Sequence, residues 1–191
     1  MLACLALLLA SLWLARRLSQ NPPYRRLAFA LAAVAVGGLF LHGVAIVATQ
    51  VLGLGTVAIF AVLAIHRLAQ DLLDLSPLQG ALVTAIFLPF TLSAIPLMAL
   101  AKGALGSLGL APFPILLLGM AAVTQLRNLP LAGEFLLAGA GLAAAVVFRG
   151  LDRPLCAAVP TGTHFLYIML AGAVLLRLVA VTSRHALAAQ G

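Results

Sequence analysis

The segment LAFALAAVAVGGLFLHGVAIVAT, residues 27–49, decides the fold class of this chain. Its 23 residues contain one ionisable side chain, that of His42. A helix needs about 20 mostly apolar residues to cross the hydrocarbon core of a bilayer. The segment therefore predicts a transmembrane helix, and similar apolar runs follow along the rest of the chain.

The composition of the whole chain is typical of a membrane protein. Hydrophobic residues make up 64% of its 191 residues and charged residues 8%, against about 45–50% and about 25% in soluble domains. Four acidic residues cannot cover the surface of a soluble protein of this size, so we exclude a soluble enzyme. The net charge of +7 comes from basic residues scattered between apolar blocks, so nucleic acid is not an expected partner.

Breaks in the apolar runs predict an all-α membrane protein, a bundle of seven transmembrane helices in a single domain. Turn residues and charged residues mark these breaks, and the loops between the spans are short. The run 138–145 is rich in alanine and glycine, which predicts either close helix packing or a hinge. The predicted spans are 1–15, 27–49, 53–70, 79–101, 107–125, 129–148 and 163–183.

The distribution of basic residues predicts the orientation of the chain. Loops on the side opposite the N-terminus hold most of the arginines, and such loops usually face the cytoplasm. The N-terminus is then outside and the C-terminus is cytoplasmic. The cytoplasmic set is Arg16, Arg17, Arg25, Arg26, Arg67, Arg127 and Arg184, and the outer set is Lys102, Arg149 and Arg153.

Two histidines are predicted to lie in the outer half of the bundle. His42 lies seven residues before the end of the second span, which is about 10 Å along a helix. His164 opens the seventh span at the same face. Histidine is a common zinc and haem ligand, so the pair is a candidate metal site. The alternative is that each ring simply donates a hydrogen bond across a helix interface.

The remaining polar residues are expected at the membrane surface. His66 lies near the cytoplasmic end of the third span, beside Arg67 and Asp71, and is predicted to be interfacial. Trp13 and Tyr24 fit the aromatic belts found at membrane surfaces.

Two segments near the C-terminus resemble a known family. They read FRGLDRPLC at 148–156 and PTGTHFLY at 160–167. They are similar to the last loop and seventh helix of bacterial alkaline-ceramidase-like proteins. These belong to the seven-helix membrane hydrolase superfamily that includes adiponectin-type receptors. The place of His42 in the second span is similar as well. The resemblance implies a location in the bacterial inner membrane.

The resemblance also implies a zinc-dependent hydrolase of lipid amide bonds. His42 and His164 occupy two of the three positions of the family's metal ligands, and the third is Ile168. The family's serine and aspartate positions are Gly38 and Gly53. Three of the five site positions are thus substituted, and the catalytic residues stay unassigned.

A replacement for the missing zinc ligand would have to come from the loop before the seventh span. Cys156 is the candidate, with Asp152 nearby, although both match the family's ordinary loop pattern. Catalytic zinc sites usually offer three protein ligands and a water, so we expect zinc at low occupancy.

Two functional hypotheses follow from these residues. The first is a ceramidase-like membrane protein that binds a membrane lipid or a sphingolipid-like amide, with amidohydrolase activity reduced or lost. The second is a haem-binding membrane electron carrier that uses His42 and His164 as axial ligands. A Soret absorption band in the purified protein would distinguish the second from the first.

Overall fold

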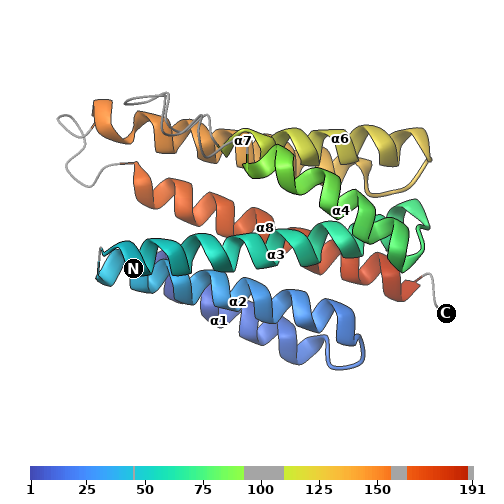
Figure 1. Cartoon of the computed structure of the whole chain (residues 1–191), viewed down its shortest axis with the longest axis horizontal. Coiled ribbons are helices and arrows are strands. Elements are labelled where there is room, and N and C mark those ends of the chain that lie inside the picture. The colour runs from blue at the N-terminus through green and yellow to red at the C-terminus, as the bar shows by residue number, and fades with distance from the viewer. Residues whose placement is uncertain (45, 93–109, 156–162, 189–191) are drawn as a thin grey trace. The chain divides into compact units, whose positions relative to one another are not determined.

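The computed structural model describes residues 1–44, 46–92, 110–155 and 163–188. Helix makes up 89% of these residues, and no strand occurs among them. The all-α prediction is therefore confirmed for the part of the chain that is described. The helices are α1 (Leu2–Arg17), α2 (Pro22–Gly43), α3 (Val47–Leu73), α4 (Pro77–Leu92), α6 (Pro112–Leu126), α7 (Ala132–Leu155) and α8 (His164–Ala188) (Figure 1).

Four of these helices are long and apolar enough to span a membrane. They are α2, α3, α8 and the segment Ala132–Asp152 of α7. The chain is therefore an integral membrane protein. Helix α1 has 16 residues, a length of about 24 Å at 1.5 Å per residue, which is shorter than the roughly 30 Å hydrocarbon core. The apolar helical segments Pro77–Phe87 in α4 and Pro112–Leu126 in α6 are also short. The seven-span topology therefore stays a prediction.

The predicted boundary between the second and third spans is wrong. Helix α2 ends at Gly43, and Val44 is extended, with φ −137° and ψ 93°. Helix α3 then begins at Val47, because Thr49 caps it: its Oγ1 accepts from the Ile46 N–H at 3.2 Å. The residues on both sides of this break are apolar, so composition does not mark it. A threonine hydroxyl that satisfies free backbone groups can end one helix and start the next without any polar run.

The predicted start of the loop between the sixth and seventh spans is also wrong. Helix α7 continues through residues 149–155, although these include charged residues. The spanning segment ends at Asp152, close to where the apolar run ends. Polar residues end the part of a helix that fits in lipid, but they do not by themselves end the helix.

The chain divides into two compact units. The first contains residues 1–84 together with the C-terminal part of α8 from Leu175, and the second contains residues 85–174. In the first unit, α2 packs against both α1 and α3. Its core includes Leu14, Leu31 and Phe60, with Val179 from α8. Small side chains such as Ala28, which is fully buried, allow these helices to approach closely.

In the second unit, α6 and α7 form a closely packed pair. A Cβ atom added at Gly139 would lie 2.8 Å from Leu118 Cδ2 and 3.2 Å from the Leu118 backbone nitrogen. A Cβ atom added at Gly141 would lie 2.9 Å from Val174 Cγ2. The small residues of 138–145 therefore serve close helix packing, which is the first of the two roles that their composition predicts.

Candidate functional site

The strongest polar arrangement in the second unit joins the end of α7 to the start of α8. Asp152 Oδ1 accepts hydrogen bonds from the backbone N–H of Thr163 at 2.7 Å and of His164 at 2.8 Å. Thr163 Oγ1 donates to the Phe148 carbonyl at 2.6 Å. The first N–H groups of a helix lack partners within that helix, and a carboxylate there also complements the helix dipole. Asp152 therefore fixes the position at which α8 begins.

His164 is held directly by this junction. It is the first residue of α8 and is half-buried. Its ring centroid lies 5.6 Å from that of Tyr167, with the planes tilted by 40°. The Arg149 guanidinium lies 5.1 Å from the centroid of the Tyr167 ring, a cation–π contact. We name Arg149, Asp152, Thr163, His164 and Tyr167 the α7–α8 junction.

The junction combines residues from both of the segments that resemble the ceramidase-like family. Arg149 and Asp152 come from 148–156, and the other three come from 160–167. One Asp152 oxygen is occupied by two backbone donors. Asp152 is therefore suited to positioning His164, and less suited to ligating a metal through that oxygen. The two segments follow one another closely in the sequence, but the sequence alone does not predict that Asp152 caps α8.

His42 lies nearer to a helix end than predicted. It is in the last turn of α2, which ends at Gly43, and its side chain is exposed. The predicted depth of seven residues from the helix end is therefore wrong, because the predicted span ran six residues too far, to Thr49. His42 belongs to the first unit and His164 to the second. Their convergence stays a prediction.

The two glycines at the family's serine and aspartate positions have different surroundings. A Cβ atom at Gly38 would lie 3.0 Å from Cys4 Sγ on α1. A Cβ atom at Gly53 would meet the Gly37 carbonyl oxygen at 3.8 Å and Leu41 Cδ2 at 3.9 Å, which are ordinary contacts. The Cβ atom of an aspartate would therefore fit at position 53 without strain, next to the turn of α2 that carries His42. A serine at position 38 would crowd Cys4.

Ile168, which the resemblance assigns to the family's third metal position, is half-buried and lies one turn after His164. Among the described residues, no group of three histidine, cysteine or carboxylate side chains could hold a metal ion. Cys156, the candidate replacement ligand, lies outside the described residues.

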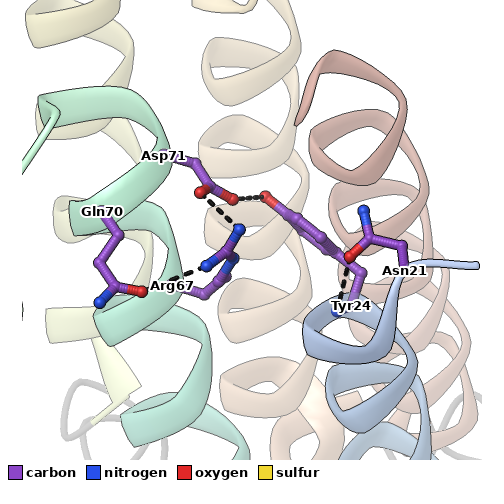
Figure 2. Close-up of polar contacts among 5 residues, drawn as sticks. All are labelled: Asn21, Tyr24, Arg67, Gln70 and Asp71. Carbon is purple, nitrogen blue, oxygen red and sulfur yellow. Dashed lines mark hydrogen bonds and ion pairs between the residues drawn. The ribbon is translucent and has the colours of Figure 1, made fainter. Parts of the chain in front are cut away.

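A second polar cluster, in the first unit, was not predicted. Tyr24 Oη donates to Asp71 Oδ2 at 2.7 Å, and Asp71 Oδ1 pairs with Arg67 Nη2 at 2.8 Å (Figure 2). Arg67 Nη1 donates to Gln70 Oε1 at 3.3 Å, and the Tyr24 N–H donates to Asn21 Oδ1 at 3.5 Å. Tyr24 is fully buried, so its assignment to an interfacial belt is wrong.

Only part of this cluster has a signal in the sequence. The four-residue spacing of Arg67 and Asp71 is typical of an ion pair on one helix face. The bond from Tyr24 crosses 47 residues of chain and has no local pattern. Near this cluster His66 packs against α4, since a Cβ atom at Gly80 would lie 3.2 Å from His66 Nδ1.

Comparisons of the chain with family models, with curated proteins and with solved structures find no match. The described helices, four of them long and apolar enough to span a membrane, define the class, an all-helical integral membrane protein. The ceramidase-like resemblance rests on the motif residues alone.

Proposed function

We propose that this protein is a ceramidase-like integral membrane protein that binds an amide-containing membrane lipid and has lost most of its hydrolytic activity. The α7–α8 junction carries this proposal. Asp152 caps α8 with two hydrogen bonds and so presents His164 beside Tyr167 at a fixed helix start. That arrangement uses the residues of both segments that resemble the family.

The chemistry of the junction suits recognition of a lipid amide. Imidazole and phenol groups both donate hydrogen bonds, and an amide carbonyl of a sphingolipid-like molecule accepts them at headgroup depth. The Arg149 guanidinium, stacked on the Tyr167 ring, adds a positive charge close to these donors. Exposed apolar side chains near the junction, such as those of Phe165 and Met169, provide contacts for acyl chains.

The residues at the family's metal positions do not fit a catalytic zinc site. Two histidines remain where catalytic zinc usually has three protein ligands, and Ile168 cannot ligate a metal. No hydrolytic step is therefore assigned to this chain. We expect metal analysis of the purified protein to give zinc well below one ion per chain.

Restoring the substituted positions tests this proposal. The variant Gly38→Ser, Gly53→Asp, Ile168→His should raise zinc occupancy toward one per chain, because it completes the family's set of site residues. Cys4→Ala belongs in the same variant, since a Cβ atom at position 38 would lie 3.0 Å from Cys4 Sγ. The matched control adds His42→Ala to this variant, which should return the zinc occupancy to that of the unmodified protein.

Two results would contradict the proposal. The first is one zinc per unmodified chain that is lost in His42→Ala or His164→Ala, which would mean that the native site is complete. The second is no gain of zinc in the restored variant, which would mean that these positions do not correspond to those of the family. A Soret band in the purified protein would support the haem hypothesis instead.

A further inference from the structure

Four arginines surround the turn between α1 and α2. Two lie in the last turn of α1 and two within the first five residues of α2, and residues 18–21 connect the helices. All four side chains are exposed. We name this set the arginine turn; its members are Arg16, Arg17, Arg25 and Arg26.

The charge of the arginine turn is not neutralised by the described part of the chain. The carboxylate of Asp71 is engaged by Arg67 and Tyr24, and no described carboxylate pairs with the four arginines. The Arg17 guanidinium instead lies 4.3 Å from the centroid of the Trp13 ring. Four positive charges at one end of a helical hairpin will attract a phosphate-bearing molecule.

An exposed apolar surface continues directly from the arginines. Trp13 is 56% exposed, and Leu9 and Phe29 on the same two helices are 69% and 52% exposed. Indole rings favour the level of the lipid headgroups. Guanidinium groups at one level and apolar side chains next to it match the headgroup and acyl chains of a phospholipid.

An unused donor lies within the same turn. Asn21 is 5% exposed, its Oδ1 accepts from the Tyr24 N–H, and its Nδ2 has no hydrogen-bond partner. Buried polar groups in proteins are nearly always paired. The turn therefore contains a buried donor that no described acceptor satisfies.

We propose that the arginine turn binds the phosphodiester headgroup of an anionic phospholipid in the surrounding leaflet. Guanidinium groups bind phosphate oxygens in a bidentate manner, and the adjoining apolar surface favours a lipid over a soluble phosphate. This surface belongs to the first unit and includes no residue of the α7–α8 junction, so the proposal does not depend on the proposed function.

Trp13, the single tryptophan of the chain, provides a direct test. The purified full chain is reconstituted in phosphatidylcholine bilayers that contain a fixed fraction of lipid with brominated acyl chains, which quench nearby indole fluorescence. The brominated lipid is either phosphatidylglycerol or phosphatidylcholine. We expect the association constant of brominated phosphatidylglycerol at Trp13 to exceed that of brominated phosphatidylcholine by about 5-fold or more, as expected for cationic side chains at an anionic surface.

Substitutions identify the residues responsible. The double variant Arg25→Gln, Arg26→Gln should bring the ratio of the two association constants toward 1. The double variant Arg25→Lys, Arg26→Lys keeps both charges and should retain most of the ratio. Both variants leave the contact between Arg17 and Trp13 in place. Arg184→Gln, which removes one exposed arginine near the C-terminus, is the control for loss of positive charge elsewhere on the chain and should leave the ratio unchanged. An unaltered emission maximum without brominated lipid confirms that a variant is folded.

Three results would overturn the proposal. Equal quenching by the two brominated lipids would show no preference for the anionic headgroup. A ratio that falls as much in Arg184→Gln as in the Arg25, Arg26 variant would show that total charge is responsible and not this turn. Relief of quenching by soluble glycerol phosphate, beyond that by chloride at equal ionic strength, would show that the turn binds soluble phosphate.

Discussion

Asp152 is the residue on which the geometry of the α7–α8 junction depends most directly. Its replacement by alanine removes Oδ1, the single acceptor shared by the Thr163 and His164 N–H groups. Loss of a helix cap costs about 0.5–2 kcal/mol, so Asp152→Ala should destabilise the protein by about 1 kcal/mol. A reversible unfolding titration in detergent measures this loss.

Asp152→Asn is the conservative comparison, because it keeps one carbonyl oxygen as an acceptor. It should lose less stability than Asp152→Ala, and it should also bind an amide lipid more tightly than the alanine variant does. Equal stability of the alanine variant and the unmodified protein would contradict the capping role.

Tyr24 and Asp71 provide a second test at the scale of the residue. The hydroxyl of the buried Tyr24 donates to Asp71 Oδ2 at 2.7 Å. Tyr24→Phe removes this bond and should cost about 1.5–3 kcal/mol, because the acceptor is charged. A double-mutant cycle with Asp71→Asn should show coupling between the two substitutions. Strict additivity would mean that the bond contributes nothing to stability.

At the scale of the helix, a substitution at Gly139 tests how closely α6 and α7 pack. Alanine normally favours a helix over glycine by about 1 kcal/mol. At Gly139 the new Cβ would lie within 3.2 Å of the Leu118 backbone nitrogen as well as its side chain, so Gly139→Ala should destabilise the protein. Gly119→Ala is the control, since nothing lies within 4 Å of a Cβ there, and it should be neutral or stabilising. A stabilising Gly139→Ala would contradict the close packing.

The existence of most helices could be predicted from the sequence, whereas several of their ends could not. Apolar runs locate the helices because lipid requires a continuous apolar surface with all backbone groups bonded internally. The ends depend on single hydrogen bonds, such as those of Thr49 at the start of α3 and Asp152 at the start of α8. Such bonds leave little trace in composition.

The candidate site was predictable to a similar degree. Its motif residues are visible in the sequence, because 148–156 and 160–167 carry them in fixed order. The cap that joins the two segments was not visible, since it depends on where α7 ends. The helical depth of His42 was predicted wrongly for the same reason, since a short break at Val44 has no polar residue to mark it.

At the scale of the whole molecule, the predicted orientation can be tested with single cysteines. In a background with Cys4→Ala and Cys156→Ala, Gln20→Cys lies in the turn between α1 and α2, and Val44→Cys lies between α2 and α3. Both positions are exposed. A membrane-impermeant maleimide added to intact cells should label position 44 and not position 20, because arginine-rich loops remain in the cytoplasm. Labelling of position 20 alone would reverse the orientation.

The measurement that tests the central claim most directly is the distance between positions 42 and 164. Spin labels on His42→Cys and His164→Cys, in a background with Cys4→Ala and Cys156→Ala, report this distance by pulsed electron resonance in a lipid bilayer. If the two histidines share one lipid-binding site, the distance should lie well below the roughly 30 Å thickness of the hydrocarbon core. A distance of about 30 Å or more, as for opposite membrane surfaces, would contradict a shared site.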